Sequence, residues 1–404
     1  MDCYLVGGAV RDRLLGLEIS ERDWVVVGAT AGQLERRGYK EVGRSFPVFL
    51  HPETHEEYAL ARRETKTAPG YRGFEVDFGP KVTLEEDLAR RDLTINAMAE
   101  DAEGHVIDPY GGQRDIEQRT LRHVSPAFRE DPVRILRAAR FAARFHGLGF
   151  GLAPETLALM RAMVADGEVA ALVPERVWQE TARALAEDAP QRFFEILREC
   201  GALKVIFPEI DRLWGVPQPE RWHPEIDTGV HVMMVLEQAA RFSSKAEVRF
   251  AALTHDLGKG VTPKEYWPRH SGHEAASARL AGEICDRLGA PKRFRALAEQ
   301  VARFHGVCHR AAELRPETLL KVLEALGAFR EGGMLEDFLA ACEADYRGRK
   351  GMTEHEYPAA EVFREAFRAA SGVSGAELAA EGYEGARLGS ELRRRRIAAI
   401  AGKL

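Results

Sequence analysis

The sequence predicts an α+β protein, in which a small head built on a mixed sheet precedes an all-helical body. Two observations support this. The first 110 residues alternate short apolar runs with turns rich in glycine and proline, a pattern typical of strands joined to short helices. From about residue 130 the chain becomes a series of alanine- and leucine-rich amphipathic segments separated by prolines. A length of 404 residues fits two to four domains of roughly 100–200 residues each.

The expected elements of the head are short. A strand at residues 4–6 leads through Gly7-Gly8 into a helix at residues 9–15, which Gly16 ends. Further strands are expected at residues 24–27, at residues 47–50 and 58–61 as the two arms of a hairpin, and at residues 106–107.

Composition narrows the class of protein. The chain carries 57 basic and 63 acidic residues and a net charge of −6, which argues against a protein that coats nucleic acid with a uniformly basic surface. Its apolar runs fall far short of the roughly 20 residues of a membrane helix, so no membrane partner is expected. The five cysteines form no CxxC pair, and the N-terminus shows no signal pattern. A cytoplasmic protein is therefore expected.

Two residue types are clustered along the chain. Seven of the 13 histidines lie between His223 and His309. The stretch from residue 119 to residue 144 contains seven arginines and only two acidic residues, Glu130 and Asp131, which gives it a local charge of +5. The arginines are Arg119, Arg122, Arg129, Arg134, Arg137, Arg140 and Arg144. We expect chemistry in these two regions.

The head contains a glycine turn followed by two carboxylates. Gly7-Gly8 precedes a helix that carries Arg11, so backbone and guanidinium N–H groups could meet an anion, although a plain tight turn has the same pattern. Glu21 and Asp23 are two residues apart and lead into a strand, which places both side chains on one face. Paired carboxylates suit Mg²⁺ bound together with substrate phosphates. A solvated strand end is the alternative.

Five segments of the head resemble class II tRNA nucleotidyltransferases, the CCA-adding enzymes of the DNA polymerase beta superfamily. They are LVGGAVRD at residues 5–12, RDW at 22–24, RRDLTINAM at 90–98, DPYGG at 108–112 and EDPVRILRAARF at 130–141. One departure is visible, because the metal pair of the superfamily is usually DxD and the first member here is Glu21.

The resemblance implies roles for individual residues. Glu21 and Asp23 hold Mg²⁺ for nucleotidyl transfer, and Asp92 lies near the ribose hydroxyls. The residues implied to bind the nucleotide phosphates are Gly8, Arg11, Arg91, Arg137 and Arg140.

Asp131 and Arg134 stand three residues apart, as neighbours on one helix surface do. A carboxylate only accepts hydrogen bonds and a guanidinium only donates them. Such a pair matches the amino group and ring nitrogen of cytosine and adenine, and it does not match guanine or uracil. This fits the family's use of protein side chains in place of a template. A simple surface ion pair is the alternative.

The body contains a histidine–aspartate pair. His255-Asp256 lies in LTHDLGKG at residues 253–260, which we expect to be a helix closing on a glycine. Together with His231, His273 and His305 it could form a nitrogen and oxygen site for a transition metal such as Ni²⁺. His270 and His309 compete with His273 and His305 by spacing. The segment resembles an HD-superfamily phosphohydrolase domain.

Together these patterns predict four parts. They are a nucleotidyltransferase head at residues 1–140, a helical neck at 141–222 that binds nucleotide and tRNA, an HD domain at 223–330 and a generic helical tail at 331–404. The four-arginine run at 393–396 in the tail could contact RNA or form a solvated helix face.

The resemblance implies addition of the 3′-terminal CCA to tRNA from CTP and ATP with release of pyrophosphate. It also implies phosphatase, 2′-nucleotidase and 2′,3′-cyclic phosphodiesterase activities. The expected partners are the tRNA 3′ end, CTP and ATP, without DNA, and both a monomer and a homodimer remain open.

The nearest rival to this function is that of a bacterial poly(A) polymerase. Those enzymes usually carry a long basic C-terminal extension, and their G-[RK]-[RK]-F signature has a second basic residue that GRSF at residues 43–46 lacks. Two rivals come from other classes of protein. One is an HD phosphohydrolase with a non-catalytic head. The other is a non-catalytic RNA-binding module, and the intact pairs Glu21/Asp23 and His255/Asp256 argue against it.

Overall fold

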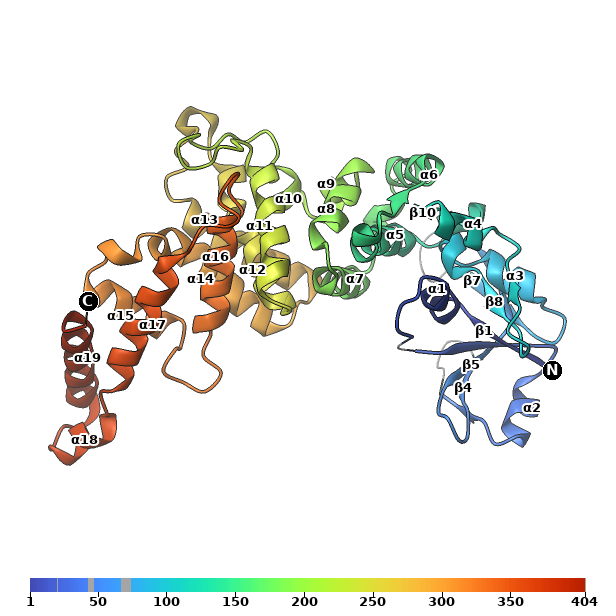
Figure 1. The fold of residues 1–404 in the computed structure, drawn as a ribbon, viewed down its shortest axis with the longest axis horizontal. Helices are drawn as coiled ribbons and strands as arrows, with labels where there is room; N and C mark the ends of the chain where they lie inside the picture. Colours follow the sequence, from blue (N-terminus) through green and yellow to red (C-terminus); the bar gives the residue numbers. More distant parts are fainter. Residues whose placement is uncertain (20, 43–46, 67–73, 404) are drawn as a thin grey trace. The chain divides into compact units, whose positions relative to one another are not determined.

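The computed structural model describes residues 1–19, 21–42, 47–66 and 74–403. The GRSF segment at residues 43–46 therefore lies outside the described residues. The chain forms two compact units, Met1–Ile206 and Phe207–Leu404, each described here by itself (Figure 1).

The N-terminal unit is built on a seven-stranded mixed sheet of order β3-β4-β5-β2-β1-β8-β9. Strands β2 and β5 pair in parallel and the other neighbours pair antiparallel, which confirms the mixed sheet predicted from the sequence. The predicted hairpin is confirmed as β4 and β5, with Val48 opposite Ala59. The strands are β1 Asp2–Val6, β2 Asp23–Val27, β3 Lys40–Glu41, β4 Val48–Leu50, β5 Glu57–Leu60, β8 Ala99–Glu100 and β9 Val106–Ile107.

Successive residues of β2 point to opposite faces of the sheet, and each of the two residues Val25 and Val26 packs in a different core cluster. Val25 packs in a cluster with Leu88 of helix α3 (Leu84–Ala89). Val26 packs in a second cluster with Leu34 of helix α2 (Ala31–Arg36). Helix α1 (Gly8–Leu14) follows β1 directly, as expected from the sequence.

Helices complete the N-terminal unit. Helix α5 packs against α7 and α8, and residue 140 lies inside α5. Prolines occupy the first turn of α6, α7 and α8, where the missing N–H costs nothing. The helices are α4 Gly112–Glu117, α5 Val133–Arg144, α6 Pro154–Ala165, α7 Pro174–Ala186, α8 Pro190–Glu199 and α9 Ala202–Ile206. Two small sheets pair β6 Arg62–Lys66 with β7 Phe74–Phe78, and β10 Thr120–Leu121 with β11 Gly151–Leu152.

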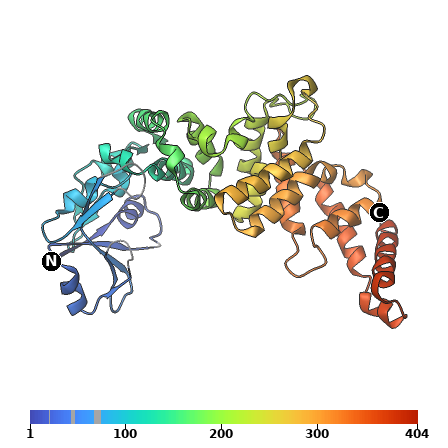
Figure 2. The same cartoon turned by 180° about the vertical axis from the view of Figure 1, so that it is seen from behind.

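The C-terminal unit consists of helices joined by loops, with no strand among its described residues (Figures 1 and 2). Helices α11, α12, α14 and α16 pack against one another, and α13 packs against α14. The helices are α10 Pro208–Asp211, α11 Thr228–Phe242, α12 Ala246–Thr254, α13 His273–Leu288, α14 Lys292–Cys308, α15 Pro316–Ala325, α16 Leu335–Arg347, α17 Pro358–Ser371, α18 Gly375–Ala380 and α19 Gly385–Ala401. Among the described residues, no helix combines the length and the hydropathy needed to span a bilayer.

The expectation of one helix through residues 253–260 is wrong. Helix α12 ends at Thr254, and a separate 3-10 helix, η5 (Leu257–Val261), begins after Asp256. Gly258 is not a left-handed cap. A Cβ atom there would lie 2.8 Å from the amide nitrogen of Ser277 and closer still to the carbonyl oxygen of His273, so the glycine allows η5 to approach α13. The break leaves His255 and Asp256 at the junction of two helices.

Candidate active sites

A cleft of about 690 Å³ lies within the N-terminal unit. Every residue of the head that the sequence assigned to a site lines this cleft. These residues are Gly8, Arg11, Glu21, Asp23, Arg91, Asp92, Asp131, Arg134, Arg137 and Arg140. The structure therefore brings together side chains that are spread over about 130 positions of the sequence, from the glycine turn to α5.

Strand pairing places the carboxylates beside the glycine turn. Asp23 pairs with Val6, the last residue of β1, and Gly7 follows with a φ of 68° that favours glycine. A Cβ atom on Gly7 would lie 2.8 Å from Nη1 of Arg91, so the turn leaves room for that guanidinium. Desolvation in the cleft raises the pKa of Asp23, and Glu21 adds to this, while Arg91 opposes it.

The arginines of the cleft have acidic partners. Nε of Arg137 lies 2.6 Å from Oδ2 of Asp92, and Nε of Arg140 lies 2.7 Å from Oε2 of Glu180. The expected local charge of +5 is therefore offset, because the carboxylates that pair with α5 come from elsewhere in the chain. Burial would raise the pKa of Asp92, but Arg137 and Asn96 lower it well below its usual range.

Asp131 and Arg134 both line the cleft, but Asp131 lies outside helix α5, so the expectation that the two share one helix surface is wrong. Asp131 precedes α5, and its Oδ1 accepts a hydrogen bond from the Val133 N–H at 3.0 Å. Arg176 of α7 donates to both oxygens of Asp131, at 3.1 and 2.7 Å. Nη1 of Arg134 donates to the carbonyl of Ala127 at 2.6 Å.

Sequence reasoning missed Asp87, the buried carboxylate that positions two arginines of the cleft. Its Oδ1 accepts from Nη2 of Arg90 at 2.8 Å, and its Oδ2 accepts from Nη2 of Arg91 at 3.1 Å. Burial alone would raise the pKa of Asp87, but Arg91 and Arg90 lower it. The spacings of three and four residues on a helix could have indicated this contact.

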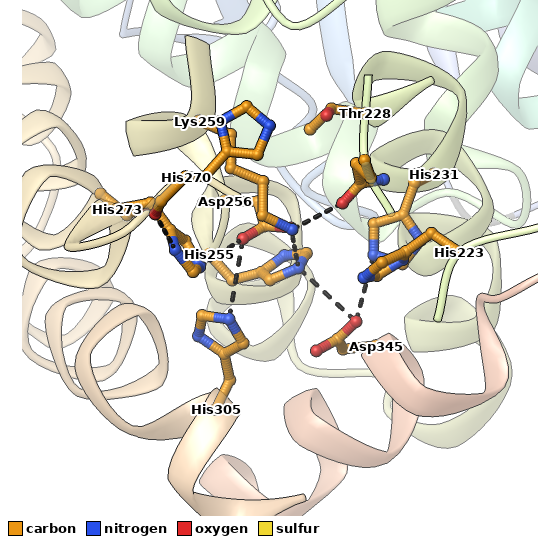
Figure 3. A network of polar contacts seen from close by, with 12 residues as sticks. His223, Thr228, His231, His255, Asp256, Lys259, His270, His273, His305 and Asp345 are labelled. Atoms are coloured by element: carbon orange, nitrogen blue, oxygen red, sulfur yellow. Dashed lines mark hydrogen bonds and ion pairs between the residues drawn. The ribbon is translucent and has the colours of Figure 1, made fainter. Parts of the chain in front are cut away.

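A second cluster lies in the C-terminal unit, where side chains from several helices point toward one another (Figure 3). The cluster combines imidazoles and carboxylates, all of them buried or nearly so. Its members are His231 on α11, His255 and Asp256 between α12 and η5, His273 on α13, His305 on α14 and Asp345 on α16.

Asp256 lies between two groups of this cluster. Its Oδ2 is 3.1 Å from Nε2 of His255 and 2.6 Å from Nζ of Lys259. Its Oδ1 is 3.2 Å from Nε2 of His273 and 3.6 Å from Nε2 of His305. The five residues that the sequence assigned to this site are thus gathered around one carboxylate or next to it.

The sequence did not indicate Asp345, because the residues beyond 330 were expected to form a generic helical tail. That expectation is wrong for α16. Oδ1 of Asp345 lies 3.1 Å from Nε2 of His231 and 3.6 Å from Nε2 of His255. Its Oδ2 lies 2.6 Å from Nε2 of His309. Helix α16 therefore supplies the second carboxylate of the cluster.

The histidines are oriented by backbone carbonyls. Nδ1 of His255 lies 2.7 Å from the oxygen of Ala252, and Nδ1 of His273 lies 2.9 Å from the oxygen of His270. Nδ1 of His305 contacts the carbonyls of Val301 and Ala302 in the same way. Because a carbonyl only accepts, each Nδ1 carries a proton, and each Nε2 is the ring nitrogen that faces the cluster.

The ring nitrogens that face the cluster fit a metal. Nε2 of His255, Nε2 of His273 and Oδ1 of Asp256 are buried without a hydrogen-bond partner in the structure. Buried polar atoms without partners are costly unless something else, such as an ion, satisfies them. Burial lowers the pKa of His305 to about 3, which keeps this imidazole neutral and able to bind a metal.

Neither competing histidine belongs to a group with metal-binding spacing among the described residues. His270 is buried with its Nε2 2.8 Å from the carbonyl oxygen of Pro217. His309 contacts Asp345 and the hydroxyl of Tyr357. In the run at 393–396, Arg393, Arg394 and Arg395 pair with glutamates, and Arg396 lies over the ring of Phe329.

Known families match both units. Residues 3–122 match a poly A polymerase head domain, residues 149–213 a probable RNA- and SrmB-binding site of polymerase A, and residues 228–328 an HD domain. The fold and its two clusters thus define an enzyme that joins a nucleotidyltransferase head to an HD phosphohydrolase domain.

Full-length relatives define the family. A protein of Thioalkalivibrio sulfidiphilus named multifunctional CCA protein is 64% identical, over 99% of this chain and 98% of its own length. A protein of the same name from Methylococcus capsulatus is 63% identical, over 99% and 94%. This chain belongs to the multifunctional CCA protein family.

Solved structures share the fold. A CCA-adding enzyme in complex with ATP is 19% identical with a TM-score of 0.68, over 100% of this chain and 86% of its own. One with CTP is 19% identical with a TM-score of 0.66, over 100% and 88%. The Thermotoga maritima CCA-adding enzyme complexed with tRNA is 18% identical with a TM-score of 0.65, over 100% and 88%.

Proposed function

We propose that this protein adds the 3′-terminal CCA to tRNA from CTP and ATP, with release of pyrophosphate, in the cytoplasm. The observation that carries this proposal is the convergence of all the assigned head residues on one cleft. The names of the full-length relatives support it over a poly(A) polymerase.

In the proposed reaction the cleft binds the nucleotide through its own side chains. Arg11, Arg91, Arg137 and Arg140 neutralise the triphosphate, and Gly8 lets a phosphate approach the backbone. Asp92 receives the ribose after Arg137 turns toward the phosphates. Glu21 and Asp23 are the residues that would hold Mg²⁺, which supplies neutralisation of the phosphate charge when it is bound.

Asp131 and Arg134 are the proposed base-selecting residues. Asp131 accepts from an exocyclic amino group and Arg134 donates to a ring nitrogen, which suits cytosine and adenine and rejects uracil and guanine. Arg176 fixes both oxygens of Asp131, so the carboxylate has a defined orientation before the base arrives.

A labelled-nucleotide assay tests this activity. On tRNAs truncated at each of the last three positions, we expect two CTP additions followed by one ATP addition. Asp23→Ala should lower the rate at least about 100-fold while tRNA binding persists. Asp2→Ala, at an exposed site on β1, is the matched control. Long A tracts would instead identify a poly(A) polymerase, and full CCA addition by Asp23→Ala would refute the assigned metal role.

We further propose that the C-terminal unit hydrolyses phosphate esters, with phosphatase, 2′-nucleotidase and 2′,3′-cyclic phosphodiesterase activities. His231, His255, Asp256, His273, His305 and Asp345 are the residues that would hold a transition metal, Ni²⁺ or similar. That metal supplies Lewis acidity toward the phosphate ester when it is bound. Lys259 holds Asp256 in place, and its Nζ also donates to Oε1 of Gln218 at 2.5 Å.

A metal screen with a 2′,3′-cyclic nucleotide tests the second activity. We expect turnover by the wild type with at least one transition metal and none by His255→Ala. His355→Ala changes an exposed histidine outside the cluster and should leave turnover intact. Equal rates for wild type and His255→Ala would refute the assignment.

These proposals keep the division into head 1–140, neck 141–222, HD domain 223–330 and tail 331–404, with one extension. Because Asp345 belongs to the metal cluster, the proposed hydrolase needs α16 as well as the HD domain.

A further inference from the structure

Four members of the metal cluster, Asp256, His273, His305 and Asp345, line a pocket of about 500 Å³, and several of its other lining residues have no role in the proposed hydrolysis. Four of these residues are Trp222, Arg269, Arg310 and Arg349. The first two lie in the loops before α11 and α13, and the last two lie just after the C-terminal ends of α14 and α16. An aromatic ring and guanidinium groups are the side chains that bind bases and phosphates, so we ask whether these four residues recognise a substrate.

The three arginines share one property, the absence of an acidic partner among the described residues. Within the described part of the chain, Arg269, Arg310 and Arg349 form no ion pair, whereas Arg347, two residues before Arg349, lies 2.7 Å from Oε1 of Glu343. Nε of Arg349 is buried and has no hydrogen-bond partner. A guanidinium with unused donors beside a metal cluster selects an anion, and phosphate accepts two of its N–H groups at once.

Trp222 is the aromatic part of this surface. Its side chain is 56% exposed, an unusual amount for the largest apolar side chain. The guanidinium carbon of Arg221 lies 4.7 Å from the indole centroid, so Arg221 covers one face of the ring. The ring also lines the pocket, and an exposed aromatic ring can stack with a nucleobase of any identity.

We propose that Trp222 is the base-stacking platform of the second active site and that Arg349 binds a substrate phosphate. These residues then favour a nucleoside phosphate or the terminal nucleotide of an RNA over a phosphate ester that carries no base. This inference rests on the proposed hydrolase function and adds the residues that recognise the base and the phosphate.

Two substrates that differ only in the base test the platform. They are 2′,3′-cyclic AMP and the 2′,3′-cyclic phosphate of 1-O-methylribose, both given to the metal-loaded full chain. A stacked base contributes about 1–3 kcal/mol, so Trp222→Ala should lower kcat/KM for cyclic AMP roughly 5- to 150-fold and leave the baseless substrate unchanged. Trp222→Phe should restore most of the loss. Tyr266→Ala removes an equally exposed aromatic residue that does not line the pocket and should have no effect.

Arg349→Gln tests the phosphate contact. Its loss should raise KM for both substrates about 10-fold or more, because both carry the phosphate, and change kcat less. Lys350→Ala, at the adjacent exposed cation, is the control. Unchanged KM values for Arg349→Gln would overturn its assignment, and an equal effect of Trp222→Ala on both substrates, or none on either, would overturn the platform.

A binding measurement separates this inference from the hydrolase itself. If the wild type hydrolyses neither substrate with any metal, the proposed hydrolase is wrong, and calorimetry with 3′-UMP decides the platform alone. Uracil is chosen because the base-selecting residues of the head reject it. Weaker binding by Trp222→Ala but not by Tyr266→Ala would uphold the platform, and equal binding by all three proteins would overturn it.

Discussion

Nε2 of His231 lies 3.1 Å from Oδ1 of Asp345, although 114 positions separate the two residues in the chain. The contact forms because α11 and α16 pack side by side. Asp345 also contacts His255 and His309, so one carboxylate of the tail links three imidazoles of the HD domain. The proposed metal site is complete only when α16 is in place.

Asp345→Asn should weaken metal binding in the C-terminal unit at least about 10- to 100-fold, because the amide keeps the shape and removes the charge. Cyclic-nucleotide hydrolysis should fall in parallel, while CCA addition stays unchanged. Metal titration followed by calorimetry measures the first effect. The control is Asp337→Asn, because Asp337 lies on the same helix as Asp345 and pairs with Lys245 instead of with the cluster. Wild-type metal affinity in Asp345→Asn would exclude it as a ligand.

Asp87→Asn should lower the free energy of unfolding at pH 7 by about 3–5 kcal/mol, since it leaves Arg90 and Arg91 without their buried carboxylate. Urea unfolding of the full chain, followed by circular dichroism, measures this loss. Asp77→Asn breaks the exposed pair with Arg63 and should cost less than about 1 kcal/mol. Similar losses for both variants would contradict the structural role of Asp87.

The effect of Asp87 should also depend on pH. Its pKa is lower in the folded protein than in the unfolded chain, where it is about 3.9. Its contribution to stability is therefore present above about pH 4 and is lost as the pH falls through the folded pKa. The difference in unfolding free energy between wild type and Asp87→Asn should shrink below about pH 4 and stay constant from about pH 6 to 8.

Gly258→Ala should destabilise the C-terminal unit by about 1–3 kcal/mol, because the added Cβ meets the carbonyl of His273 and lies 2.8 Å from the amide nitrogen of Ser277. The displaced His273 should also weaken metal binding. Gly389→Ala, in helix α19 with open space around the added atom, should be neutral or stabilise by about 0.5–1 kcal/mol. Thermal unfolding of both variants is the measurement, and a wild-type melting temperature for Gly258→Ala would contradict the packing argument.

Arg176→Met should release Asp131 and relax base selection, because the carboxylate loses its bidentate partner. We expect misincorporation of UTP relative to CTP to rise about 10-fold, with little change in tRNA binding. Arg192→Ala, which removes an i,i+3 pair on α8, should leave selectivity unchanged. Single-nucleotide incorporation assays provide both rates, and unaltered selectivity would show that Arg176 does not orient Asp131.

Local patterns predicted the head well. The short apolar runs of β1, β2, β4 and β5 are typical of strands, and each strand lies at its expected place within a few residues. The motifs that resemble nucleotidyltransferases converge on one cleft, because the pairing of β1 with β2 brings the carboxylates beside the glycine turn.

Partners from distant segments could not be predicted. The spacing of Asp131 and Arg134 suggested a pair on a helix, but the chain turns at Pro132 and Asp131 reaches α7 instead. The glutamate that pairs with Arg140 is likewise on α7. Such contacts depend on how helices pack, and periodicity within one helix carries no information about it.

Because Asp345 takes part in the proposed metal site, the smallest segment that could carry the hydrolase activity to another protein must include it. A fragment ending at residue 328, where the HD match stops, would keep every histidine of the cluster and lose a carboxylate that faces two of them. A gene fusion or an engineered transfer of this activity must therefore carry the chain through α16. The boundary of the recognisable sequence and the boundary of the proposed catalyst are therefore different, and recombination at the first would remove both Asp345 and a helix that packs on α11, α12 and α14.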